Sequence, residues 1–289
     1  MADFPERVQI NEKNIEKVTT FYKRAYQEIV DEIQGATKFG KNNRRAILQQ
    51  IEKILTELGV DSQELVKQEL PKYYKTGADQ AVEQLKSINA NVAVSTGFNK
   101  VHKEAILAII DDSAKAIAES ISGVGRSASR LLNTAVKEEL KFRLAAGETS
   151  GEALEQTKKK IKGVLQDEGL SALTDKSGRK WELDRYTEML IRTKGVEARN
   201  TGLVNRLIEN GYDLVQVSAH GATDVCESWE GKILSATGQT KGYPTVADAE
   251  SDGLFHPNCK HAINVIVLDL AKETMGWNPK TQEYEKGLL

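Results

Sequence analysis

Cysteine is scarce in this sequence, because Cys226 and Cys259 are the only two among 289 residues. So few thiols give no sign of a disulfide framework. A chain of this length can bury a sizeable apolar core without cross-links. The sequence is therefore typical of a globular protein with one large domain or two smaller ones.

The sequence also lacks an excess of either charge and any long apolar run. Its net charge is −2 although 28% of its residues are charged, so no overall field indicates binding to nucleic acid or to a basic partner. No stretch of about 18 apolar residues is present to span a bilayer. The first residues, Met1 to Arg7, do not have the basic and then apolar order of a signal peptide. We expect a soluble protein that is made in a reducing cytoplasm and has no place in a membrane.

Apolar residues recur at spacings of three and four through most of the first 168 residues, which is typical of amphipathic helices. A first stripe runs over residues 15–33. Gly59 and the pair in Gly123–Gly125 follow later stripes, and we expect them to end helices. Pro71 lies inside another stripe and is expected to kink or divide that helix. The sequence thus predicts a separate helical domain over residues 1–168.

The last helix of this domain carries the densest basic run in the chain. Thr149 and Glu152 form a T-x-x-E capping box that marks its start. The lysines Lys158–Lys160 and Lys162 follow. Such a run is usually a solvated helix face, and the alternative is contact with phosphates.

The pattern changes after Gly169. A turn signal at Asp175–Gly178 predicts a short hairpin, and a long helix follows from Asp184 to Gly211. Alternating, β-branched segments then predict strands over residues 212–218 and 262–268.

Together these patterns predict an α+β fold that is mainly α. The N-terminal helical domain is followed by a small α+β domain over residues 169–275, which contains the long helix and a short antiparallel sheet. Residues 276–289 are mostly polar and are expected to form an extended tail.

Arg185, Arg192 and Arg199 lie seven residues apart on the predicted long helix and therefore share one face. Two interpretations remain open. The arginines are either solvated and paired with carboxylates such as Glu188, or they form a docking stripe for a partner.

Both cysteines and three of the four histidines lie in one short part of the chain, between the two predicted strands. In chain order these residues are His220, Cys226, His256, Cys259 and His261. The spacings H-x-x-C and C-x-H suit a small closed site for a borderline-soft cation such as zinc, because thiolate and imidazole ligands converge there from a turn and from a second loop.

The sequence leaves three interpretations of this segment. In the first, Cys226, Cys259 and His261 hold one structural zinc ion between the strand ends, with His256 or His220 as the fourth ligand. In the second, the thiols are simply packed in a small core. In the third, the two cysteines form a disulfide in an oxidising compartment.

Four segments of the second half form an ordered combination, namely Asp175–Thr193, Ser218-x-His220, Trp229-x-Gly-Lys232 and Asn258-Cys-Lys-His261. This combination resembles the signature of tailed-phage minor capsid proteins, the phage minor capsid protein 2 and Mu protein F-like head morphogenesis group. The resemblance covers approximately residues 170–270, and the helical half is similar only in character. Cys226 stands where relatives often have histidine, an exchange that keeps a zinc ligand.

The resemblance implies a structural virion component that is made in the host cytoplasm and built into the capsid interior near the portal vertex. Its implied partners are the portal protein, the major capsid or scaffold protein, and packaged double-stranded DNA. The implied roles are procapsid assembly and DNA delivery.

The alternative function is a metal-dependent hydrolase, either a nuclease or a peptidase. His220 or His256 would then act as a general base beside a metal that keeps a position open for water. The segment lacks an H-E-x-x-H motif and an obvious carboxylate pair, although Asp224, Glu227 and Glu230 lie close by. A third hypothesis, a protein that contacts DNA inside the head, rests on the lysine run and the arginine stripe. A structural protein without enzymatic activity is the leading hypothesis.

Overall fold

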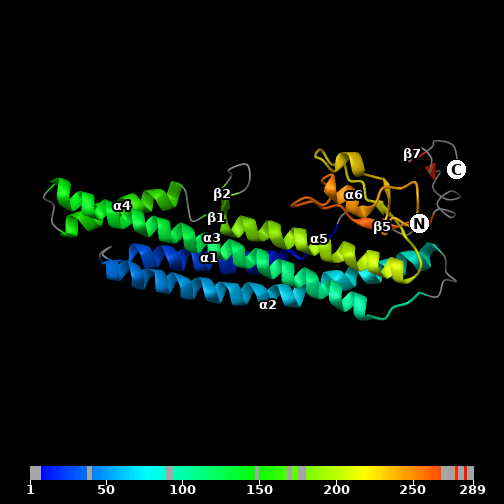
Figure 1. The fold of residues 1–289 in the computed structure, drawn as a ribbon, viewed down its shortest axis with the longest axis horizontal. Helices are drawn as coiled ribbons and strands as arrows, with labels where there is room; N and C mark the ends of the chain where they lie inside the picture. Colours follow the sequence, from blue (N-terminus) through cyan, green and yellow to red (C-terminus); the bar gives the residue numbers. More distant parts are fainter. Residues whose placement is uncertain are drawn as a thin grey trace. The chain divides into compact units, whose positions relative to one another are not determined.

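The structure is a computed structural model, which describes residues 8–37, 41–88, 94–146, 150–167, 171–174, 180–267, 277–278 and 283–284 (Figure 1). The α-helices are α1 (Glu12–Gln34), α2 (Lys41–Ile88), α3 (Lys100–Ala146), α4 (Ser150–Asp167), α5 (Leu183–Glu209) and α6 (Val246–Ser251). The strands are β1 (Ser171–Thr174), β2 (Lys180–Glu182), β3 (Leu214–Val217), β4 (Ile233–Ser235), β5 (Ile263–Val265), β6 (Trp277–Asn278) and β7 (Glu283–Tyr284), and a 3₁₀ helix, η1, spans Glu227–Trp229. These elements confirm the predicted α+β fold that is mainly α. Among the described residues, no helix combines the length and the apolar character needed to cross a membrane.

The chain forms two compact units that interleave along the sequence. Unit 1 consists of Met1–Ile10, Lys67–Asp111 and Ile191–Leu289, and unit 2 consists of Asn11–Val66 and Asp112–Leu190. Helices α2, α3 and α5 each contribute residues to both units. The predicted domain borders at residues 168 and 275 stay predictions. The predicted capping residue Thr149 and the predicted turn at residues 175–178 lie outside the described residues.

Two antiparallel strand pairs occur outside the main sheet. Strands β1 and β2 pair with each other and confirm the predicted hairpin. Strands β6 and β7 also pair, with Trp277 opposite Tyr284. This second pair lies within the segment that the sequence predicted as an extended tail.

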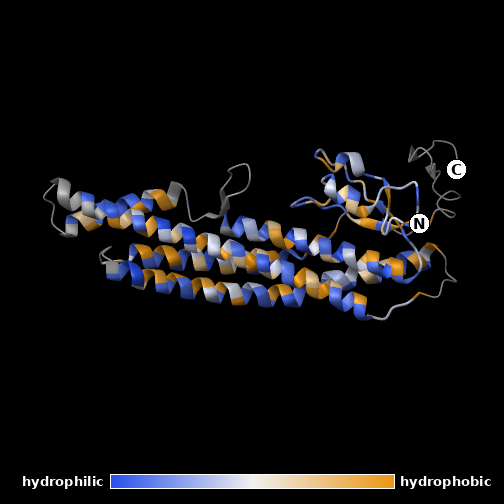
Figure 2. Cartoon of the chain, viewed as in Figure 1, coloured by the Kyte–Doolittle hydropathy of each residue, from blue (hydrophilic) through white to orange (hydrophobic). Residues whose placement is uncertain are grey.

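Helix α1 in unit 2 buries the apolar stripe that the sequence predicted. Asn11 caps its start, since the Asn11 side chain accepts a hydrogen bond from the backbone N–H of Lys13 at 3.1 Å. The buried residues recur at spacings of three and four and are Ile15, Val18, Tyr22, Ala25, Ile29, Val30 and Ile33. Figure 2 shows apolar residues repeating among hydrophilic ones along the helices. The stripe is therefore confirmed as the core face of α1.

Gly59 and the Gly123–Gly125 pair do not end helices, so those predictions were wrong. Helix α2 continues through Gly59, and α3 continues through Gly123–Gly125. In unit 2 a Cβ atom on Gly59 would lie 3.3 Å from Cδ1 of Ile121, and one on Gly125 would lie 3.5 Å from Cδ1 of Leu55. Gly59 and Gly125 therefore lie against apolar side chains of the other helix and not at a chain reversal.

Pro71 does not divide α2, which runs without a break from Lys41 to Ile88. A proline in a helix interior removes one backbone donor and costs about 3 kcal/mol. Leu70, Tyr73 and Tyr74 beside it are all buried. Their burial offsets the local cost, which is why the helix continues.

Strands β4, β3 and β5 form an antiparallel sheet in unit 1, in that order. Val215 at the centre lies opposite Leu234 of β4 and Val265 of β5. Because directly opposed residues share a face of the sheet, these three side chains point the same way. They belong to one buried cluster with Ala81 and Leu85 of α2, so helices cover this face of the sheet.

The sequence predicted β3 and β5 but missed the elements between them, among them β4 and α6. Strand β4 is three residues long, which is too short to show alternation. Helix α6 begins with a capping box in which Thr245 and Asp248 exchange side-chain and backbone hydrogen bonds. The T-x-x-D spacing was the available signal for this helix.

Helices α2 and α5 approach closely in unit 1 at two glycines. A Cβ atom on Gly77 would overlap the backbone carbonyl of Arg199, and one on Gly202 would overlap the backbone carbonyl of Tyr74. Each glycine therefore lies against the backbone of the other helix. Only glycine permits so short a separation.

His102, the histidine outside the Cys/His segment, lies in a separate buried network of unit 1. Its ring is 1% exposed. The Nδ1 atom lies 2.9 Å from the Tyr74 hydroxyl, and Nε2 lies 3.1 Å from a carboxylate oxygen of Glu209. Glu209 also forms an ion pair with Arg206, whose guanidinium donates to the Gly97 carbonyl at 2.7 Å. This network joins α5 to the segment before α3.

Candidate functional site

The ends of β3 and β5 bring the two halves of the Cys/His segment together, as the sequence predicted. The backbone N–H of Ser218 donates to the Ala262 carbonyl at 2.8 Å, and the N–H of Ala262 donates to Oγ of Ser218 at 3.0 Å. His220 follows β3 and His261 precedes β5. Their rings stack with centroids 4.2 Å apart.

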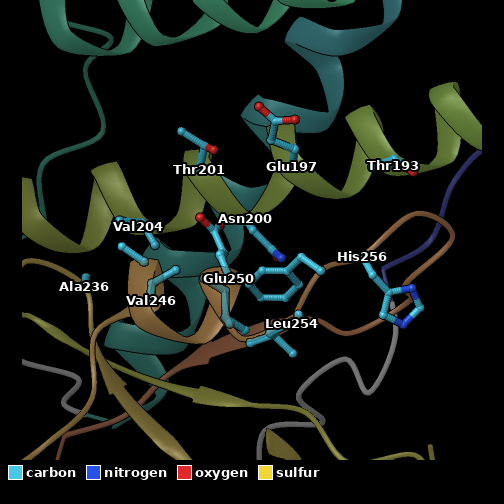
Figure 3. Close-up of a pocket in the computed structure, with 14 residues that line it drawn as sticks. Thr193, Glu197, Asn200, Thr201, Val204, Ala236, Val246, Glu250, Leu254 and His256 are labelled. Atoms are coloured by element: carbon cyan, nitrogen blue, oxygen red, sulfur yellow. The ribbon is translucent and has the colours of Figure 1, made fainter. Parts of the chain in front are cut away.

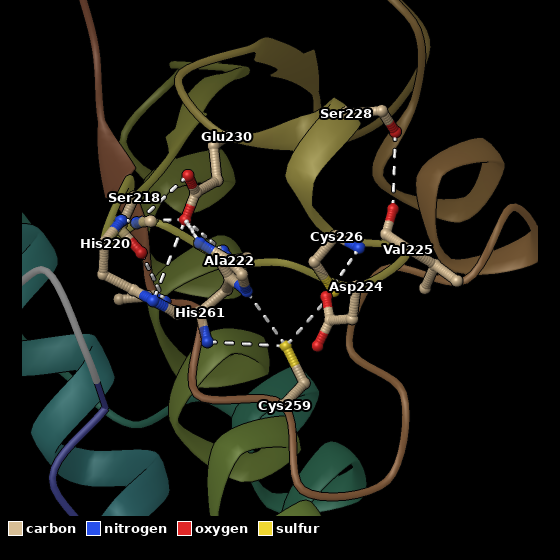
Figure 4. A network of polar contacts seen from close by, with 12 residues as sticks. Ser218, His220, Ala222, Asp224, Val225, Cys226, Ser228, Glu230, Cys259 and His261 are labelled. Carbon is tan, nitrogen blue, oxygen red and sulfur yellow. Dashed lines mark hydrogen bonds and ion pairs between the residues drawn. The ribbon is translucent and has the colours of Figure 1, made fainter.

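Glu230 organises the turn that follows β3 (Figure 4). Its carboxylate accepts hydrogen bonds from the backbone N–H groups of His220, Gly221 and Ala222 at 2.8, 3.2 and 3.0 Å. It also accepts from Nε2 of His261 at 3.1 Å. Burial by itself would raise the pKa of Glu230, but these hydrogen bonds lower it to about 2. The carboxylate is therefore ionised and its oxygens are occupied by donors.

His261 is held in one orientation by its two ring nitrogens. Because Nε2 donates to Glu230, Nδ1 carries the lone pair of the neutral ring, and it lies 3.2 Å from Sγ of Cys259. Burial lowers the pKa of His261, against the raising effect of Glu230. The neutral form, with Nδ1 as an acceptor, is the form that can bind a metal ion.

The two cysteines are buried next to each other without a bond between them. Their Sγ atoms are 3.7 Å apart. Cys226 lies just before η1, where its backbone N–H donates to the Asp224 carboxylate at 2.9 Å. Burial and the neighbouring thiol of Cys259 raise the pKa of Cys226 to about 12. The thiol of Cys226 is therefore protonated at neutral pH when it has no other partner.

His256 reaches the cysteines from a tightly turned loop. Phe255 and Asn258 have φ angles of 61° and 67°, in the left-handed region that residues other than glycine rarely adopt. Nδ1 of His256 lies 2.9 Å from the Pro257 carbonyl, and Nε2 lies 3.0 Å from the carboxylate of Asp224. One donor atom from each of Cys226, His256 and Cys259 lies within 4.8 Å of the other two. His220, Glu230 and His261 form a second such group.

A pocket of about 710 Å³ lies beside this loop in unit 1 (Figure 3). Glu197 and Asn200 of α5, Glu250 of α6, and His256 contribute to its lining. Burial, and then the nearby charge of Glu197, raise the pKa of Glu250. Asn200 is 6% exposed, and its Nδ2 atom has no hydrogen-bond partner in the part of the chain that the structure describes. His256 lines this pocket, and its side chain is 29% exposed.

The three arginines of α5 do not form one exposed stripe. Arg185 is exposed and pairs with Glu182 at 3.4 Å, whereas Arg192 is half-buried. Arg199 is 2% exposed, and its guanidinium donates to Gln80 at 2.8 Å and to the Ile263 carbonyl at 2.6 Å. Burial lowers the pKa of Arg199 to about 10. The seven-residue spacing identified a common helix face, but part of that face packs against α2 and β5.

The lysine run on α4 in unit 2 is partly neutralised. Lys158 lies 3.7 Å from Glu155, and Lys160 lies 2.6 Å from Glu138. These ion pairs favour the interpretation of a solvated face.

The functional residue that the sequence left without a role is Glu230. Sequence reasoning noted it only as a carboxylate near the cysteines. Its partners are mainly backbone N–H groups, which leave no signal in the residue types. The spacing of Trp229-x-Gly-Lys232 was the nearest available sign that this turn is specified.

Comparison with known proteins gives one family. A family model described as phage minor capsid protein 2 matches residues 12–284, which is nearly the whole chain. No curated protein and no solved structure gives a match.

Proposed function

The chain belongs to the phage minor capsid protein 2 family, and from this membership we propose that it enters the head of a tailed phage beside the portal and acts in procapsid assembly and DNA delivery. Its proposed partners are the portal protein and the major capsid or scaffold protein, with packaged double-stranded DNA as a further contact. The family match over residues 12–284 is the observation that carries this proposal, because it includes both units.

The long helices suit a protein that acts by binding partners on its surface. Helices α2 and α3 are 48 and 47 residues long, which gives each unit extended helical faces. Some large apolar side chains remain exposed on them, among them Val60 at 63%, and Val101 and Leu107 at 58% and 59%. Exposed apolar side chains favour association with a partner.

A metal-dependent hydrolase finds less support in the geometry. Glu230 is occupied by three backbone N–H groups and His261, and Asp224 is occupied by the N–H of Cys226 and by His256. Neither carboxylate is free to activate water. The hydrolase hypothesis therefore has no observation that favours it over a structural role.

The proposal is tested by deleting the gene in the phage and by expressing the protein with its cognate portal. We expect the two proteins to elute as one complex from gel filtration, and particles made without this protein to assemble or infect poorly. An asymmetric reconstruction of the particle should place the chain inside the shell at the portal vertex. Normal particles of full infectivity from the deletion mutant would contradict the assembly role, and density elsewhere in the shell would contradict the location.

A further inference from the structure

We propose that Cys226, Cys259, His256 and His261 bind one structural zinc ion, which joins the turn after β3 to the loop before β5. This proposal does not rest on the proposed function, because its argument uses only the donor atoms of unit 1.

The distance between the two sulfur atoms fits a shared metal ion. Zinc binds thiolates at about 2.3 Å in a tetrahedral arrangement, which places two sulfur ligands about 3.8 Å apart. The Sγ atoms of Cys226 and Cys259 are 3.7 Å apart. Both residues are buried, at 0% and 5% exposure, so the two thiols face each other away from bulk water.

His261 has the second contact that metal-binding histidines usually have. Such histidines donate their other ring N–H to a carboxylate, which fixes the tautomer and aims the free nitrogen at the metal. The Nε2 atom of His261 donates to Glu230 at 3.1 Å, and Nδ1 lies 3.2 Å from Sγ of Cys259. A nitrogen and a sulfur that share a tetrahedral zinc ion lie about 3.6 Å apart. Nδ1 therefore lies beside one of the two sulfur ligands, but His261 is outside the group formed by Cys226, His256 and Cys259, so its ring has to move toward these three residues when the ion binds.

His256 is the fourth ligand in this proposal, and His220 is not a ligand. The donor atoms of His256 and the two cysteines lie within 4.8 Å of one another, and His261 contacts Cys259 through Nδ1. His220 instead stacks on the His261 ring and lies 3.8 Å from Glu230. Nδ1 of His256 lies 2.9 Å from the Pro257 carbonyl, and a hydrogen bond there assigns Nε2 to the metal, so Nε2 exchanges its 3.0 Å contact with the Asp224 carboxylate for the ion. The ring of His220 then stacks on the ring of the ligand His261.

The donor set selects the metal and its role. Two thiolates and two imidazoles are typical ligands of zinc, and four protein ligands leave no position for water. The site is therefore a structural one that stabilises the fold of unit 1 and does not activate water.

The first test is the metal content of the full-length protein purified under reducing conditions. We expect about one zinc ion per chain. After the zinc is replaced by cobalt, the visible spectrum should show the intense bands of tetrahedral cobalt and a thiolate-to-cobalt charge-transfer band. Because these measurements use the unchanged chain, they do not depend on whether any variant folds.

The second test separates the ligands from their neighbours. We expect Cys226→Ser, Cys259→Ser and His256→Asn each to lose most of the bound zinc. Glu230→Gln should keep it with about 10- to 100-fold weaker affinity, because Glu230 only orients His261. The matched control is His102→Asn, which removes a histidine of the same unit from a separate network and should retain about one zinc ion per chain.

Three results would overturn the proposal. The first is negligible zinc in the reduced protein after incubation with zinc chloride and dialysis. The second is a cobalt spectrum without thiolate bands. The third is a Cys226–Cys259 disulfide, seen as a two-dalton mass difference, in protein kept under reducing conditions.

Discussion

Asp213 and Glu230 each hold a loop of unit 1 by accepting several hydrogen bonds with one carboxylate. Asp213 accepts from Oγ of Ser235 and from the backbone N–H groups of Thr237 and Thr240, at 2.5, 2.8 and 3.1 Å. Burial by itself would raise the pKa of Asp213, but these hydrogen bonds lower it to about 2. The carboxylate therefore stabilises the folded protein in its ionised form.

We expect Asp213→Asn to lower the free energy of unfolding at neutral pH by on the order of 1–2 kcal/mol, because an amide replaces several charged hydrogen bonds with fewer neutral ones. The folded-state pKa of Asp213 is depressed below the unfolded value of about 4. Its contribution is thus fully present above about pH 4 and is lost as the pH falls toward about 2. Urea unfolding of both proteins across this range measures the difference.

Asp252→Asn is the control for this prediction, since Asp252 is an exposed carboxylate of the same unit. We expect it to leave the free energy of unfolding nearly unchanged. A difference between Asp213→Asn and the unchanged protein that stays constant from neutral pH to about pH 2 would contradict the role of the charge.

At the scale of single residues, the sequence located the candidate ligands but not their supports. Both cysteines and all three predicted histidines lie in the turns after β3 and before β5, because strand patterns on either side bracketed them. The supporting carboxylates were not located, since their partners are backbone N–H groups that every residue except proline possesses. Arg199 was placed on the right helix face, but spacing does not tell which part of a face becomes buried.

At the scale of elements, the long helices show that glycine within an apolar stripe has two meanings. At a helix end it permits a left-handed turn, and between helices it permits close approach. The sequence predicted the first meaning for Gly59 and Gly123–Gly125, and the structure has continuous helices there. The two meanings differ only in what lies opposite the missing side chain, which the sequence of one helix does not contain.

Gly202→Ala tests this second meaning where α5 meets α2. A methyl group there would overlap the Tyr74 carbonyl, so we expect the free energy of unfolding to fall by on the order of 2–4 kcal/mol. The control is Gly163→Ala in α4, where a Cβ atom meets nothing within 4 Å. It should raise the free energy of unfolding by about 0.5–1 kcal/mol through better helix propensity. Circular dichroism during thermal and urea unfolding measures both, and an undiminished stability of Gly202→Ala would contradict the close approach.

At the scale of the whole molecule, periodicity predicted the fold class but could not place the borders of the units. It describes consecutive segments, whereas the compact units are made of segments far apart in the chain. Ala81 and Leu85 of α2 share a buried cluster with Val215 and Ile263, although they belong to the predicted helical domain. Contacts between residues so far apart along the sequence leave no local pattern in it.

Limited proteolysis tests the predicted domain border. We expect the first cuts between residues 163 and 176. Because α2 shares a core with β3 and β5, we also expect the two fragments to elute together from gel filtration until denaturant is added. First cuts in the middle of either half would contradict the border, and fragments that separate without denaturant would contradict the shared core.

The cluster that joins α2 to the sheet remains incomplete during most of the synthesis of the chain. Ala81 and Leu85 leave the ribosome long before Ile263 of β5, which completes their packing. The interval is roughly 180 residues, or on the order of ten to thirty seconds at ordinary rates of translation. During that time the apolar face of α2 in unit 1 has no sheet to cover it. A message truncated before β5 would therefore yield a polypeptide with this face exposed, which makes such products prone to aggregation and to capture by chaperones.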